Sequence, residues 1–205
     1  MQSIDTEPVK VLLVIRLMTA FESSIANGKW KPEGSPTISW LLSGLEQDER
    51  FLPEVIFTRS KMRNRPDFWL KRFHKQKITL QGSSIKPLVL CHCIALLNGE
   101  RLLGLKYFIR ELFHAVAVFK FIKVFNPELI YVDRSNWLTA AFVARLTKTK
   151  VVFRLLGIPP DMNEIFSSWA PYNVILRWAL RSPFSHVICT QDGSNTNSWL
   201  KAALK

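Results

Sequence analysis

The sequence has 205 residues, 48% of them hydrophobic, and a net charge of +12 at pH 7. This apolar content excludes a globally disordered chain and is enough for the core of one domain. The excess of basic residues favours a partner with negative charge, such as phosphate, a nucleotide, acidic lipid or nucleic acid.

The first half of the chain opens with an apolar run at 9–15, which predicts a strand covered on both faces. After an irregular segment, Ser35 and Pro36 predict the start of a helix, as N-cap and first helical residue. Residues 52–57 predict a second strand and residues 78–80 a short third one.

The second half begins with two predicted helices, at 88–97 and 102–125. Residues 128–133 predict a buried strand, because they form a short apolar run that directly follows a proline. Elements then alternate: helix 137–147, strand 150–154, helix 174–180, strand 186–190 and helix 195–204. Strands separated by helices indicate an α/β fold with a doubly wound parallel sheet of about six strands and helices on both faces.

Polar residues follow two of these strands where a sheet of this kind binds ligands. Asp133, Arg134 and Asn136 come after strand 128–133, and Arg154 and Gly157 lie at the end of the next strand. Asp133 can orient a substrate hydroxyl or act as a base, and Arg154 can neutralise phosphate. An alternative is that Asp133 or Ser135 only caps the helix beginning at residue 137.

Residues 59–77 hold eight basic residues against one acidic residue, with aromatic residues between them. This composition suits an acidic membrane surface, where cations meet headgroups and rings lie at the interface. The candidate contacts are Arg63, Arg65, Trp69, Lys71 and Arg72. A solvated loop is the second interpretation, and nucleic acid, which the same composition also suits, is the third and unlikely one.

The cysteines and the apolar runs indicate a location. Three cysteines form no even disulfide framework, which favours a reducing, intracellular setting. No leader and no run of about 18 apolar residues is evident, so we expect a cytoplasmic protein able to lie on the inner face of the cell membrane. Cys91, His92 and Cys93 are expected on a helix, where positions two apart do not face each other, so we expect no metal site.

The order of four motifs resembles the N-terminal, acceptor-binding half of GT-B glycosyltransferases, specifically the retaining family-4 group. The motifs are a strand, loop and helix at 9–46, Pro-Glu-Leu-Ile-Tyr-Val at 127–132, Val-Val-Phe-Arg-Leu-Leu-Gly at 151–157, and Ser-His-Val-Ile-Cys-Thr at 185–190 with its turn. The resemblance covers nearly all 205 residues and implies a Rossmann-like domain over residues 1–205, with 59–77 as a basic aromatic insertion or loop.

The resemblance also implies a function: transfer of a sugar from a nucleotide sugar to a polysaccharide or lipid-linked acceptor, with no metal and no other cofactor. The donor-binding C-terminal half, with its paired glutamates, is expected to be absent, so the chain would be truncated or split, inactive alone and a partner for a separate C-terminal half. A histidine that family members often have near Arg154 is missing here, which weakens a catalytic role for this region.

Further site residues follow from the resemblance. The loop that approaches donor phosphate and acceptor would contain Asn27, Gly28, Trp30, Gly34 and Ser35. Asp192 and Gly193 would face the same cleft, although Asp192 also suits a plain turn and the loop an ordinary strand-to-helix connection. A second hypothesis is a basic Rossmann-like binding module that docks on acidic lipid or RNA without catalysis.

Overall fold

The computed structural model describes residues 7–17, 36–59, 73–77, 79, 81–92, 103–155, 165, 169–189 and 199–201. The strands are β1 (Val9–Arg16), β2 (Phe51–Arg59), β3 (Phe73–Lys77), β4 (Leu88–His92), β5 (Leu129–Asp133), β6 (Lys150–Leu155) and β7 (His186–Cys189). The helices are α2 (Pro36–Gln47), α3 (Leu103–Phe125), α4 (Trp137–Leu146) and α5 (Pro171–Leu180), with a short 3-10 helix, η3 (Arg134–Asn136).

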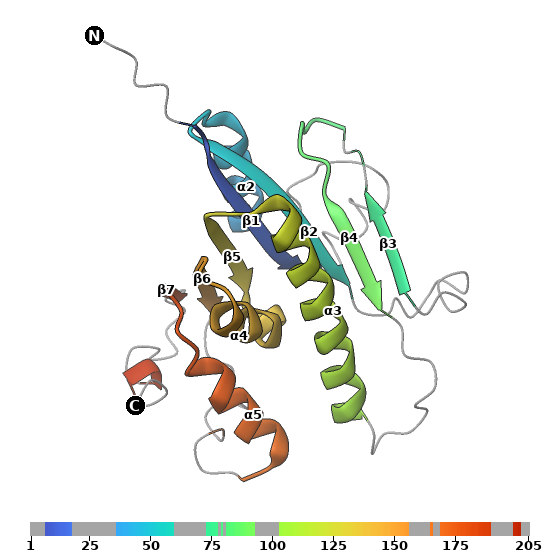
Figure 1. Ribbon diagram of the computed structural model, residues 1–205, viewed down its shortest axis with the longest axis vertical. Helices are drawn as coiled ribbons and strands as arrows, with labels where there is room; N and C mark the ends of the chain where they lie inside the picture. The colour runs from blue at the N-terminus through green and yellow to red at the C-terminus, as the bar shows by residue number, and fades with distance from the viewer. Residues whose placement is uncertain are drawn as a thin grey trace.

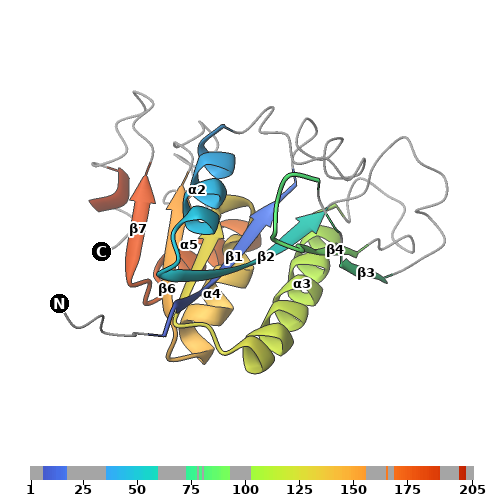
Figure 2. The same cartoon turned by 90° about the horizontal axis from the view of Figure 1, so that it is seen from above.

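The strands form one sheet in the order β3-β4-β2-β1-β5-β6-β7 (Figure 1). The six strands from β4 to β7 in this order pair in parallel, so the doubly wound parallel sheet is confirmed. Helix α2 covers one face, and α3, α4 and α5 cover the other (Figure 2). The edge strand β3 pairs antiparallel with β4, which the sequence pattern did not predict.

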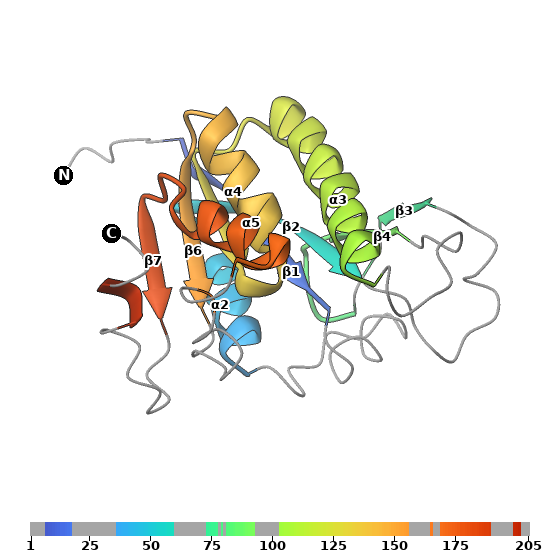
Figure 3. The ribbon, with the colours of Figure 1, turned by 90° about the horizontal axis from the view of Figure 1, so that it is seen from below.

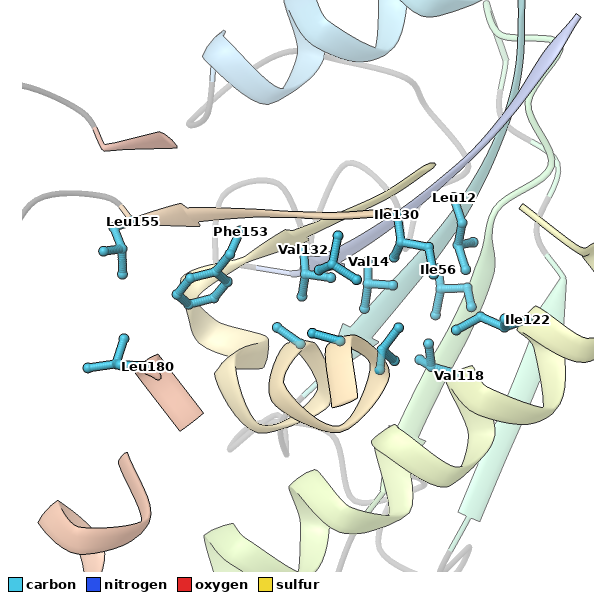
Figure 4. Close-up of a cluster of buried hydrophobic side chains, with 14 of the residues drawn as sticks. Leu12, Val14, Ile56, Val118, Ile122, Ile130, Val132, Phe153, Leu155 and Leu180 are labelled. Carbon is cyan, nitrogen blue, oxygen red and sulfur yellow. The ribbon is translucent and has the colours of Figure 1, made fainter. Parts of the chain in front are cut away.

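The central strands are apolar over most of their length because both of their faces are covered. In β1, Leu12 and Val14 pack toward α3 and α4, whereas Leu13 and Ile15 pack toward α2. Figure 4 shows the larger of the two clusters, which lies between the sheet and the three-helix layer. This two-sided burial fixes the register, since a slip by one residue would exchange the two sets of side chains.

Two predicted elements are wrong. Residues 88–97 were expected to form a helix, but Leu88–His92 is strand β4, with Leu88 and Leu90 packed on one face of the sheet and Val89 on the other. Of the strand predicted at 78–80, only Thr79 is described, and it lies outside any strand, whereas β3 forms the end of the basic segment 59–77. A short continuous apolar run suits either a buried strand or a buried helix, so its pattern alone does not distinguish them.

The turn between α3 and β5 leads the chain from the helical layer into the sheet. Asn126 has a left-handed φ of 50°, and its N–H donates to the carbonyl of Ile122 at 2.8 Å. Asparagine tolerates this conformation after a helix, and Pro127 prevents the helix from continuing. The turn is therefore encoded locally, and it starts β5 beside β1, where Glu128 N–H donates to the Lys10 carbonyl at 2.9 Å.

None of the helices in the described ranges combines the length and apolar character needed to cross a bilayer.

Candidate functional site

The strand order reverses direction between β1 and β5. From β1 the chain winds outward to β2 and β4, and from β5 it winds the other way to β6 and β7. The carboxyl ends of β1 and β5 are neighbours, because Val14 is in register with Val132. In open α/β sheets, ligands bind outside the carboxyl ends of the strands at such a reversal. Arg16 and Asp133, the last residues of these two strands, therefore mark the candidate site.

Asp133 joins the two strands at this point. It is 1% exposed, and its Oδ2 accepts a hydrogen bond from the backbone N–H of Arg16 at 2.7 Å. Its Oδ1 accepts from the Asn136 side-chain amide at 2.7 Å. Burial raises the pKa of Asp133, although the hydrogen bond from Arg16 opposes this rise. Both carboxylate oxygens thus accept hydrogen bonds from the protein, and Asp133 stabilises the edge of the sheet. Its catalytic role stays a prediction.

Asn136 extends the connection to the next strand. It is fully buried, and its Oδ1 accepts a hydrogen bond from the hydroxyl of Thr58, near the end of β2, at 2.6 Å. Asn136 precedes the first residue of α4, yet neither α4 nor η3 has a side-chain capping hydrogen bond. The capping interpretation of Asp133 and Ser135 is therefore wrong. Buried polar side chains instead connect β2, β1 and the segment after β5.

Below this network, Arg16 forms an ion pair with Glu111 of α3. Arg16 Nη2 also donates to the Ser135 carbonyl at 3.0 Å, and Arg110 Nη2 lies 2.9 Å from the same Glu111 oxygen, Oε1. Burial alone would raise the pKa of Glu111, but His114 and the two guanidinium groups lower it to about 2. Glu111 is therefore ionised at neutral pH and fixes α3 to the end of β1.

His114 lies beside this ion pair, with its Nδ1 3.8 Å from Glu111 Oε1. Burial lowers the pKa of His114, which favours the uncharged imidazole at neutral pH. Sequence reasoning missed Arg16, Glu111 and His114. Two signals were present: an arginine ends a mostly apolar strand, and one acidic residue interrupts a long, mostly apolar helix.

Arginines follow the carboxyl edge of four neighbouring strands. Arg59 ends β2, Arg16 ends β1, Arg134 follows β5 and Arg154 is the penultimate residue of β6. Arg154 is buried, and its Nη1 donates to the Tyr131 hydroxyl at 3.1 Å. Burial raises the pKa of Tyr131, so this hydroxyl stays protonated. Arg16 is paired with Glu111, and a row of guanidinium groups of this kind is a chemistry that suits phosphate groups.

The structure brings four of the predicted site residues to one edge: Asp133, Arg134, Asn136 and Arg154. The other predicted site residues lie outside the described residues: Asn27, Gly28, Trp30, Gly34, Ser35, Gly157, Asp192 and Gly193. The proposed membrane contacts Arg63, Arg65, Trp69, Lys71 and Arg72 also lie outside them.

The Cys91-His92-Cys93 motif lies partly on a strand and not on the expected helix. Cys91 and His92 belong to β4, and Cys93 falls outside the described residues. Within the described ranges, no three His, Cys, Asp or Glu side chains are grouped so that they could hold a metal ion.

Comparison with known proteins gives structural likenesses but no match by sequence. No family model matches the sequence, and no curated protein matches it. Among solved structures, the UDP-GlcNAc 2-epimerase from Methanocaldococcus jannaschii is similar, with a TM-score of 0.49 and 14% sequence identity over 96% of this chain. The chain spans 43% of that enzyme. A likeness this distant supports no functional argument, so the argument rests on the geometry of the sheet.

Proposed function

We propose that the chain is the acceptor-binding half of a GT-B glycosyltransferase similar to family 4. In this proposal it takes part in moving a sugar, with retention of configuration, from a nucleotide sugar to a polysaccharide or lipid-linked acceptor. The observation that supports the proposal is the row of arginines at the carboxyl edge, centred on the reversal between β1 and β5. A diphosphate-linked acceptor carries the negative charge that this edge would bind.

The side chains at the edge have different roles in the proposal. Arg154 and Arg134 attract the phosphate groups of the acceptor, so that no metal or other cofactor is required for charge neutralisation. Asp133 and Asn136 keep the ends of β1, β2 and β5 together. The loop residues Asn27, Gly28, Trp30, Gly34 and Ser35, together with Gly157, Asp192 and Gly193, would complete the acceptor site.

The nucleotide sugar would be held by a second Rossmann-like half that carries paired glutamates, and the 205 residues would be inactive without it. Reading the coding DNA beyond the codon for Lys205, and the neighbouring genes, tests this part of the proposal. A second half with paired glutamates is expected there. A gene region that encodes no such half, either in the same reading frame or next to it, would contradict this part of the proposal.

Binding of inorganic pyrophosphate by isothermal titration calorimetry tests the anion site directly. Arg154→Gln is expected to weaken binding at least about tenfold, because charged hydrogen bonds contribute more than about 1.4 kcal/mol. Tyr131→Phe removes the hydrogen-bond partner but keeps the guanidinium group, and it should retain most of the affinity. Arg181→Gln, an exposed change after α5, is the matched control. Equal affinity of all four proteins would overturn the assignment.

Deleting the gene tests the transfer reaction. Mass spectrometry of the cell-surface polysaccharides and glycolipids is expected to show the loss of a sugar that the wild-type gene restores and the Arg154→Gln gene does not. Unchanged glycans would contradict glycosyl transfer.

The alternative function is a binding module without catalysis, and the net charge of +12 is the observation that favours it. Gel shifts with single-stranded RNA, beside pyrophosphate titrations, separate the two functions. Two results together would favour the module. The first is tight RNA binding that is lost when Arg63, Arg65, Lys71 and Arg72 are changed to glutamate. The second is that deleting the gene leaves the glycans unaltered. The glycosyltransferase proposal predicts that such tight RNA binding is absent.

A further inference from the structure

The three-helix layer carries an unusual share of exposed apolar side chains. In the described part of the chain, twelve large hydrophobic residues are exposed, and eight of them belong to α3, α4 and α5. They include Phe113, Val116, Val124, Leu146, Val174 and Trp178. Clustering of this kind on one layer, and not scattered single residues, indicates an interaction surface.

These side chains point away from the sheet. In α3, Val118 and Ile122 pack into the core, whereas Val116 and Lys120 lie on the opposite side of the helix. In α5, Leu176 and Leu180 face the core, and Val174 and Trp178 lie opposite them. Figure 3 shows the three helices on the same face of the sheet, and α4 packs against both α3 and α5. We call their exposed sides the outer helical surface.

The outer helical surface has a one-sided charge. The single acidic residue in α3, α4 and α5 is Glu111, which is buried against Arg16. The basic residues of these helices are Lys106, Arg110, Lys120, Lys123, Arg145 and Arg177. Lys120, Lys123 and Arg145 are exposed among the apolar side chains. An acidic partner would therefore meet basic groups on this surface and no exposed carboxylate from the three helices.

Cations on this surface lie over aromatic rings. The Arg145 guanidinium group is 4.6 Å from the centre of the Trp178 ring, and Lys123 Nζ is 5.2 Å from that of Phe119. Exposed apolar and aromatic side chains beside lysine and arginine are the composition of helices that lie in the plane of a membrane interface. The basic groups add electrostatic attraction to acidic lipid.

We propose that the outer helical surface docks on a bilayer containing acidic lipid. Charge complementarity selects this occupant over a second copy of the chain, because two such surfaces would place like charges against each other. The surface lies on the outer side of α3, α4 and α5, and its exposed residues are not those assigned to the carboxyl edge of the sheet. The proposal therefore goes beyond the proposed function and does not depend on glycosyl transfer.

Sedimentation of the full chain with vesicles tests the proposal. The vesicles contain phosphatidylcholine with about a third phosphatidylglycerol, and vesicles of phosphatidylcholine alone serve as the neutral control. Lys120→Glu with Lys123→Glu is expected to weaken binding at least about 25-fold, since each basic group near an acidic surface contributes about fivefold. Lys86→Glu with Lys150→Glu makes the same change of charge at exposed positions outside the three helices and should weaken binding far less.

A second pair of variants tests the apolar contribution. Val116→Ser with Val124→Ser should lower binding to acidic vesicles, whereas Trp40→Ser with Ile188→Ser, which changes exposed residues outside the layer, should not. Circular dichroism checks that each variant keeps the wild-type helix content. Three results would overturn the proposal: no binding to acidic vesicles, equal losses from both lysine pairs, or a stable dimer by light scattering that Val116→Ser with Val124→Ser dissociates. Pyrophosphate binding reports separately on the carboxyl edge.

Discussion

Changing Glu111 to glutamine tests the ion pair beneath the candidate site. The folded protein holds the pKa of Glu111 at about 2, against 4.5 for an unperturbed side chain. At about 1.4 kcal/mol for each tenfold change, this difference corresponds to about 3 kcal/mol of stability. Because the folded-state pKa is lowered, that stability is fully present above pH 4.5 and is lost as the pH falls toward 2. Breaking a buried ion pair by removing one partner gives a similar cost, about 3–5 kcal/mol.

The assay is urea denaturation followed by circular dichroism, at neutral pH and at several values between about 5 and 2. At neutral pH, Glu111→Gln should lower the free energy of unfolding by about 3 kcal/mol. The difference between wild type and variant should shrink as the pH approaches about 2. Glu49→Gln, the same change at an exposed position, is the control. A difference that stays constant with pH, or a cost equal to that of the control, would refute this account of the ion pair.

Three further changes probe the buried network at the site and the packing of the helices and the core, each measured as the free energy of unfolding. Asn136→Ala should cost about 2–4 kcal/mol because it removes the buried amide that accepts from the Thr58 hydroxyl and donates to Asp133 Oδ1. Thr58→Val leaves the hydrogen bond between Asn136 and Asp133 in place and should cost less. Phe153→Ala should cost about 3–5 kcal/mol, since Phe153 is fully buried and its ring centre lies 4.9 Å from that of Phe184. A cost near that of a substitution at an exposed position would contradict this packing of the core. Arg145→Ala should cost about 1–2 kcal/mol, because Arg145 stacks on Trp178 and donates to the carbonyls of Trp178 and Arg181. An equal loss of stability in Arg145→Lys would mean that the guanidinium geometry matters. No loss in either variant would contradict the contact.

The sequence predicted the parts of the fold that local patterns encode. Strands β1, β5 and β6 are short apolar runs bounded by polar or proline residues, and Asn126-Pro127 marks the turn into β5. From these elements alone, Asp133 and Asn136 could be placed at the carboxyl edge of the sheet. The parallel order then follows from the regular alternation of strands and helices.

Other features could not be read from local patterns. The run beginning at Leu88 is apolar on both faces, so periodicity does not separate a buried strand from a buried helix. Strand β3 is hidden in a basic segment whose composition resembles a solvated loop. The pair between Arg16 and Glu111 joins residues 95 positions apart, and their meeting depends on how α3 packs against β1. Tertiary packing therefore decided the features that the sequence analysis missed.

The central claim is that the carboxyl ends of β1, β2, β5 and β6 form one anion-binding edge. The most direct test is a titration of the isotope-labelled chain with inorganic pyrophosphate, followed by the backbone amide signals in NMR spectra. The account predicts that the signals of Arg16, Arg59, Arg134 and Arg154 shift together along one binding curve. Shifts confined to the opposite ends of the same strands, at Val9, Phe51, Leu129 and Lys150, or no shifts at all, would contradict it.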